Sequence, residues 1–138
     1  MILQTKTKVP VKTRNVNFPK QTVYAELTDT NINEKSRTYT FHFKEWWEEE
    51  IKVEAPNEET GEMETKSRIK KHPLPTEIKP ETMSFQEVSQ MKQQISANVQ
   101  APPNLEGEDL DAFVRSIGHL FLNNQNQVRG VEWEIKEQ

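Results

Sequence analysis

The stretch that decides the fold is Thr38-Tyr-Thr-Phe-His-Phe-Lys-Glu-Trp-Trp-Glu-Glu-Glu-Ile-Lys-Val53. Six of its eight odd-numbered positions carry apolar residues, whereas Trp46 is the only apolar residue at an even-numbered position. A period of two is typical of a β-strand that buries one face. At about 3.3 Å per residue the stretch would extend about 50 Å, and an ordinary strand has only ~5–6 residues. We therefore expect part of this strand to project from the body of the fold.

The residues that follow predict a return strand. Glu59-Thr-Gly61 suits a three-residue hairpin loop, because the last loop position needs a positive φ that glycine adopts without strain. In that register the residue numbers of opposed residues sum to 120. Lys52 opposite Arg68 is unfavourable, but the other pairs are complementary. They are Ile51 with Ile69, Glu50 with Lys70, and Glu54 with Lys66.

The segments on either side of the hairpin are also extended. Residues 21–28 alternate between apolar and polar positions and predict another strand, which the turn-rich residues 29–33 link to the long strand. Residues 72–83 contain three prolines, which exclude a helix interior or a central strand. They are typical of an extended linker.

The last third of the chain predicts two helices and a strand. Ser84 and Glu87 have the spacing of a capping box, and residues 101–104 interrupt the helix that it starts. The apolar stripe of this helix is Phe85, Val88, Met91, Ile95 and Val99. The second helix begins near Glu108 to Leu110, and its stripe is Leu110, Phe113, Val114, Ile117, Leu120 and Phe121. Alternating residues at 131–136 predict a closing strand.

These elements predict an α+β fold: an antiparallel sheet with a long protruding β-hairpin, two packed helices and a C-terminal strand. We divide the chain into a basic extended arm (1–20), a β part with the hairpin (21–71), a Pro-rich linker (72–83) and a helical part with the closing strand (84–138). One compact domain and two small lobes are both compatible with this order.

The composition provides little material for a core. Hydrophobic residues, Tyr included, make up 33% of the 138 residues, and the mean hydropathy is −0.90. Typical domains carry about 45–50% apolar residues, so we expect disordered segments or a core completed by a neighbour. The absence of cysteine fits a reducing compartment. We see no membrane span and no signal peptide, and expect a cytoplasmic protein with no membrane partner.

Charge is unevenly distributed. Residues 1–20 carry five cations and no acid, a charge of +5. Because the whole chain has a net charge of −4, residues 21–138 carry a net charge of −9. We take four of these cations as candidate partner contacts: Lys6, Lys8, Lys12 and Arg14. Residues 44–64 hold nine glutamates against two lysines. The basic arm of one subunit can therefore bind this acidic segment of the next, head to tail. The alternatives are an arm that meets nucleic acid and a solvated, disordered terminus.

The sequence offers no candidate catalytic residue, metal site or cofactor. Its four glycines are too far apart for a phosphate-binding loop. Its three histidines lie in separate segments without the spacing of a metal site. In the run Glu48-Glu-Glu50 only the two outer carboxylates share a side of the strand, which favours an exposed acidic face over a catalytic pair.

Trp46 and Trp47 are adjacent, so in a strand they point to opposite faces. We expect Trp47 in the core and Trp46 outward, beside Glu48 and Glu50, as an anchor for a protein partner or a platform for a sugar ring. Trp46, Glu48 and Glu50 are therefore further candidate contact residues. A bulge that turns both indoles inward is the alternative.

These features favour a non-enzymatic structural or adaptor subunit of an oligomeric assembly, which engages other protein subunits, of the same or another kind, through arm and hairpin. In general character the chain resembles small virion proteins of tailed bacteriophages, those of the neck, tail or baseplate. The resemblance implies a virion component that is cytoplasmic during assembly, and it carries over no residue roles. The alternative is a ligand-binding module for carbohydrate or nucleic acid, although the acidic remainder disfavours extensive phosphate binding. An enzyme is the third hypothesis, without a motif to support it.

Overall fold

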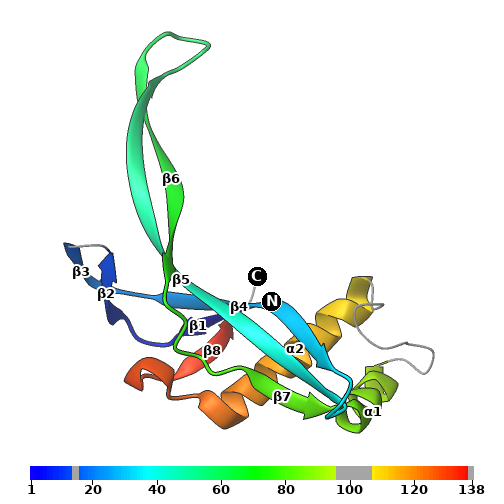
Figure 1. Cartoon of the computed structure of the whole chain (residues 1–138). Coiled ribbons are helices and arrows are strands. Elements are labelled where there is room, and N and C mark those ends of the chain that lie inside the picture. Colours follow the sequence, from blue (N-terminus) through cyan, green and yellow to red (C-terminus); the bar gives the residue numbers. More distant parts are fainter. Residues whose placement is uncertain (14–15, 96–106, 137–138) are drawn as a thin grey trace.

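The computed structural model describes residues 1–13, 16–95 and 107–136, and it confirms the α+β fold class (Figure 1). The main sheet has the order β6-β5-β4-β1-β8, and β7 also pairs with β5. Its strands are β1 (Ile2–Thr5), β4 (Val23–Asn33), β5 (Thr38–Pro56), β6 (Met63–Leu74), β7 (Glu81–Ser84) and β8 (Trp133–Lys136). The other elements are the hairpin of β2 (Val9–Thr13) and β3 (Val16–Gln21), the helices α1 (Phe85–Ile95) and α2 (Gly107–Gln125), and the 3₁₀ turn η1 (Val128–Gly130).

Strand β5 organises the sheet, as its sequence pattern predicts. One edge pairs with β4 from Thr38 to Trp47, and the other edge pairs first with β7 and then, from Glu45 onward, with β6. Beyond Trp47 the strand has no β4 partner, and β5 and β6 leave the body together as a long two-stranded hairpin (Figure 1). The predicted protruding hairpin is confirmed.

The predicted register of the hairpin is wrong by one residue. Opposed residue numbers sum to 119, so Glu50 faces Ile69 and Ile51 faces Arg68. The cause is Asn57, whose side-chain oxygen accepts the N–H groups of Glu59 at 2.8 Å and Thr60 at 3.3 Å. This Asx-type contact lengthens the loop to residues 58–61. Gly61 has the expected positive φ, 73°.

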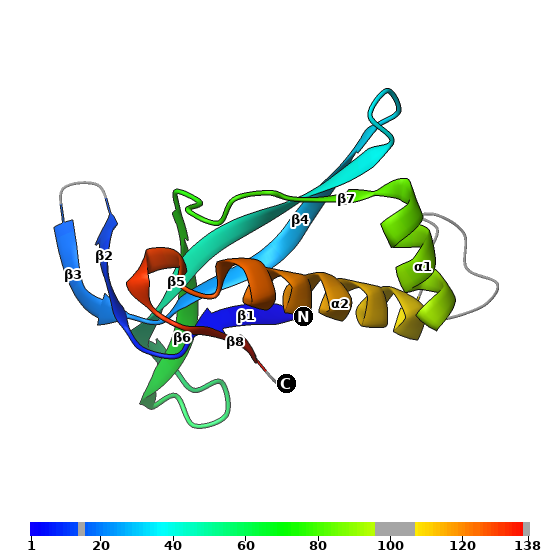
Figure 2. The ribbon, with the colours of Figure 1, turned by 90° about the horizontal axis from the view of Figure 1, so that it is seen from below.

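The helices cover one face of the sheet, and α2 lies along it (Figure 2). This inner face carries the odd-numbered apolar residues of β5, because side chains alternate along a strand. Four aromatic pairs join the layers, all with ring centroids within 6.0 Å: Tyr39 with Phe85, Phe41 with Phe113, Phe43 with Phe121, and Phe121 with Trp133. One hydrophobic cluster thus contains residues of the strands and of both helices.

The predicted helix patterns are largely correct. The hydroxyl of Ser84 accepts the N–H of Glu87 at 3.1 Å, so Ser84 caps α1. In α2 the predicted stripe residues Phe113, Ile117 and Phe121 are buried. Leu110, however, is 41% exposed, so the stripe begins one turn later than predicted. The predicted stripe residue Val99 lies outside the described residues.

Truncation of Phe113 to alanine is expected to lower the free energy of unfolding by about 3–5 kcal/mol. Its side chain is 3% exposed and meets the ring of Phe41 edge-on. Leu110→Ala in the same helix is the matched control, with an expected loss of about 1 kcal/mol or less. Urea denaturation followed by tryptophan fluorescence measures both, and equal losses would contradict this description of the core.

The described part of residues 1–20, which the sequence assigns to a basic extended arm, forms strands of the fold instead. Strand β1 lies inside the sheet between β4 and β8, where Leu3 is opposite Ala25 on one side and Ile135 on the other. Leu3 is fully buried, and Val9 and Val11 of β2 are buried too. The cations obscured these short strands because they lie between and beside the few apolar positions.

Residues 72–83 are not a free linker. Strand β6 continues to Leu74, and β7 resumes on the same edge of β5 from Glu81. Between them the chain makes an excursion, residues 75–80, whose Ile78 is buried. The side chain of Gln125 in α2 accepts the N–H of Lys79 and donates to its carbonyl, both at 2.8 Å. The excursion is therefore fastened to the helix.

The predicted turn at residues 29–33 is also wrong, because β4 runs on to Asn33 after an irregularity between Leu27 and Asp29. The turn lies at residues 34–37, where the side-chain oxygen of Asn33 accepts the N–H groups of Lys35 and Ser36. An asparagine side chain again sets where the chain reverses, as in the longer hairpin.

Candidate interaction surface

The strongest candidate for a functional surface is the projecting hairpin, residues 48–71, which we call the ribbon. The pairing of β4 with β5 ends at Trp47, and within the described residues no strand pairs with the outer edge of β6. Every residue of β6 from Met63 to Lys71 is exposed. Both edges of the ribbon are thus open, and its β6 side chains are exposed on both faces.

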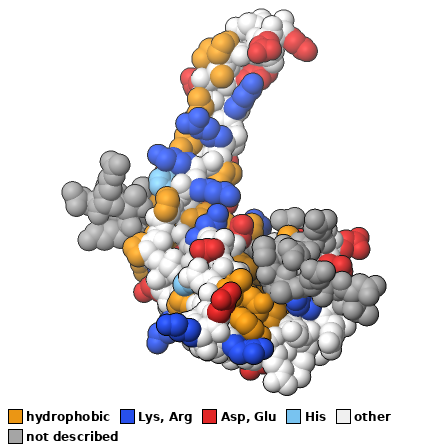
Figure 3. Space-filling model, turned by 45° about the vertical axis from the view of Figure 1, so that its right-hand side comes forward, with side chains coloured by type: hydrophobic (Ala, Val, Ile, Leu, Met, Phe, Trp, Pro, Cys, Tyr) orange, Lys and Arg blue, Asp and Glu red, His pale blue; other side chains and the backbone are white. Residues whose placement is uncertain are grey.

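The two strands of the ribbon carry opposite charge. From Glu48 to Pro56, β5 has four glutamates and one lysine, a net charge of −3. From Met63 to Leu74, β6 has four Lys or Arg residues and one glutamate, a net charge of +3. Cations follow the ribbon along its length and acids gather near its tip (Figure 3). Met63 and Ile69 add apolar surface, with exposures of 62% and 56%.

A tryptophan packs on each face of the ribbon where it leaves the body, at Trp46, Trp47 and His72, which we call the root. On the inner face Trp47 stacks on His72, with ring centroids 4.3 Å apart, and His72 Nε2 lies 2.9 Å from a Glu49 carboxylate oxygen. On the outer face Trp46 stacks on Tyr24 at 5.9 Å. Adjacent indoles on opposite faces therefore clamp the strand where it leaves the body.

The predicted placement of Trp46 is correct in its face and wrong in its exposure. Its indole is on the outer face, yet Trp46 is only 4% exposed. The ammonium groups of Lys44 and Lys71 lie 5.6 and 5.1 Å from its ring centroid, which are cation–π distances. Tyr24 covers it further, and burial together with the Glu48 carboxylate raises the pKa of this phenol. Trp46 is thus a covered residue of the root and not an open platform.

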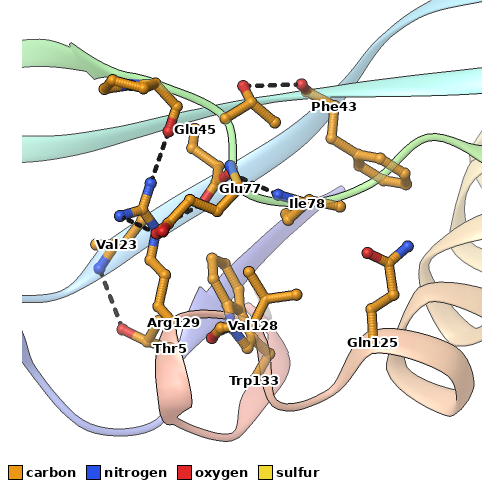
Figure 4. Close-up of polar contacts among 12 residues, drawn as sticks. Thr5, Val23, Phe43, Glu45, Glu77, Ile78, Gln125, Val128, Arg129 and Trp133 are labelled. Carbon is orange, nitrogen blue, oxygen red and sulfur yellow. Dashed lines mark hydrogen bonds and ion pairs between the residues drawn. The ribbon is translucent and has the colours of Figure 1, made fainter.

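A buried ion pair lies behind the root (Figure 4). The side chain of Glu45 is fully buried, and one of its oxygens accepts Arg129 Nε at 2.7 Å. The other oxygen accepts the N–H groups of Glu77 and, at 3.1 Å, Ile78. Arg129 also donates to the Pro75 carbonyl at 2.8 Å. The excursion is thereby fixed against β5. The sequence signal for this network was a glutamate at a buried-face position of β5, and no prediction was drawn from it.

The candidate contact residues fall into two groups. Trp46, Glu48 and Glu50 lie together on the outer face at the start of the ribbon, where Glu48 faces Lys71. Lys6 and Lys8 are exposed between β1 and β2, and the Lys6 ammonium lies 3.5 Å from Glu132. Of Lys12 only the backbone in β2 is described, and Arg14 lies outside the described residues. The expected contact between arm and ribbon stays a prediction.

Other kinds of site have little support in the described part of the chain. There, no group of three or more His, Asp or Glu residues is close enough to hold a metal ion. Neither described helix combines the length and apolar character needed to cross a membrane. Comparison of the chain with protein-family models, with curated proteins and with solved structures finds no match.

Proposed function

We propose that this chain is a non-enzymatic structural or adaptor subunit of a larger protein assembly, and that the ribbon is the element that engages its neighbours. The observation that carries the proposal is a two-stranded ribbon with open edges and exposed apolar residues. Two strands alone are at best marginally stable in water, and a third strand or a packed face is needed. A neighbouring chain that adds a strand supplies both.

The low apolar content supports the same proposal, because subunits of assemblies complete their cores against one another. The general character of the chain favours a virion component of a tailed bacteriophage, in the neck, tail or baseplate, that is cytoplasmic during assembly. A carbohydrate-binding role has less support, because the covered Trp46 leaves no open aromatic face at the root. The net charge of −4 disfavours nucleic acid.

Replacement of residues 50–69 by an Asn-Gly turn is expected to leave the body folded and to abolish assembly. Glu49 and Lys70 form a hydrogen-bonded pair, because such pairs alternate along the ladder from Asn57 and Glu62, and a two-residue turn joins a pair of this kind without strain. Light scattering after size exclusion measures assembly of the chain with the proteins encoded beside it, and circular dichroism checks the fold.

Trp46, Trp47 and His72 remain in this variant, so the root stays clamped. Gln86→Ala with Gln90→Ala, two exposed positions of α1 outside the ribbon, is the matched control and should assemble normally. The proposal fails if the intact chain stays a monomer with every one of these proteins, or if the ribbon-less variant still assembles.

A further inference from the structure

We infer that the partner of the ribbon is a second copy of this chain, and that the outer edge of β5 in one copy pairs with the outer edge of β6 in the next, to form a closed ring. This inference rests on the proposed function and adds the identity of the neighbour. Three observations carry it: charge, strand direction and the positions of outward-pointing backbone groups.

The charges of the two edges are complementary. The β5 edge carries −3 and the β6 edge +3. Contact between two β5 edges or between two β6 edges sets like charges against each other, whereas β5 against β6 sets opposite charges together. Within one ribbon this combination already exists, since Glu48 faces Lys71 and Glu49 faces Lys70. A neighbouring copy extends the same alternation, so each acidic strand lies between two basic ones.

Strand direction is compatible with a ring. Because β5 and β6 are antiparallel, copies related by rotation about an axis along the ribbon place β5 beside the neighbour's β6 in the antiparallel sense. Such contacts join two different surfaces and close into a ring when the rotation closes. Every strand then has two neighbours, and the exposed edges disappear.

Backbone groups point outward at matching positions. Asn57 N–H donates to the Glu62 carbonyl at 2.7 Å, so that pair bonds inward. Pairs alternate along an antiparallel ladder, hence the even-numbered residues of β5 and the odd-numbered residues of β6 direct their backbone groups outward. These are Glu48, Glu50, Lys52 and Glu54 on β5, and Thr65, Ser67, Ile69 and Lys71 on β6. Pro73, which lacks an N–H, follows them at the root and ends the edge.

Cysteine cross-linking tests the inference directly, since the natural chain has no cysteine. Lys52→Cys marks the β5 edge, and Thr65→Cys, Ser67→Cys and Ile69→Cys, made singly, mark three registers of the β6 edge. Each β6 variant is co-expressed with the differently tagged Lys52→Cys chain, oxidised at low ionic strength and examined on non-reducing gels. Ser89→Cys, on an exposed position of α1, replaces the β6 cysteine in the control.

A disulfide between the two differently tagged chains is expected for at least one β6 variant. It should be absent for each variant alone and in the control, and it should not form when oxidation is carried out in high salt, because salt screens the attraction between the edges. Light scattering of the intact chain should give a single closed stoichiometry. Cross-links in a variant expressed alone would overturn the inference in favour of a two-fold contact. No cross-link from a chain that still assembles with other proteins through its ribbon would overturn it and leave the proposed function standing. A chain that assembles with nothing would refute both.

Discussion

Removal of residues 1–5 is expected to abolish cooperative folding. These residues include β1, which pairs with β4 and with β8, so its loss detaches β8 and opens the middle of the sheet. Leu3 is fully buried, and truncation of such a leucine alone costs about 2–5 kcal/mol. A domain has only about 5–15 kcal/mol of stability in total. Thermal unfolding followed by circular dichroism should show a broad change or none.

The matched control leaves β1 in place and removes charge instead. Lys6→Ala with Lys8→Ala should change the free energy of unfolding by about 0.5 kcal/mol or less, because both side chains are exposed and the ion pair of Lys6 with Glu132 is at the surface. If the truncated chain melts with the cooperativity and midpoint of the intact one, β1 contributes nothing and the first residues are a dispensable tail.

Arg129→Ala is expected to lower the free energy of unfolding by about 3–5 kcal/mol, because it leaves the buried Glu45 carboxylate without its cation. The same change removes the hydrogen bond to Pro75 that fixes the excursion. Urea denaturation measures the loss. A cost below about 1 kcal/mol would contradict a structural role for the pair.

A double variant separates the charge from the packing. Glu45→Gln combined with Arg129→Met removes both charges and keeps an oxygen that can accept the N–H groups of Glu77 and Ile78, so it should cost less than Arg129→Ala alone because no unpaired carboxylate stays buried. Arg129 has a positive φ of 64°, which any residue other than glycine or asparagine tolerates poorly, so Arg129→Gly reports the backbone contribution separately. Equal losses for Arg129→Ala and the double variant would show that packing, and not the charge, is responsible.

The long strand, the hairpin and the two helices were predictable because each repeats a local pattern over many residues. Tyr39, Phe41 and Phe43 keep one period throughout, and Ser84 marks a helix start by its own chemistry. Strand β1 has only four residues, too few for a period to emerge. The hairpin register depended on the Asn57 side chain, which competes with the Gly61 signal for the position of the loop.

The environment of the root could not be predicted, because it is assembled from distant parts of the chain. Trp46 is covered by Tyr24 from β4 and by Lys71 from β6, and no local pattern announces either neighbour. Glu45 was an anomaly visible in the sequence, a charge at a buried-face position, but its partner Arg129 lies 84 residues away. The odd or even position of a residue in a strand predicts which face its side chain lies on, but it does not predict which residues cover that side chain.

The ribbon is fixed at its root and free at its tip, so it responds to force like a beam held at one end. The nine residues of β5 beyond Trp47 reach about 30 Å at ~3.3 Å per residue. A load on the tip becomes a bending moment that is greatest at the fixed end, where the indoles of Trp46 and Trp47 resist it from opposite sides. Behind them the Glu45–Arg129 pair ties that end to the excursion and to η1. A force applied to the tip is therefore carried by the buried indoles of the root and by the Glu45–Arg129 pair.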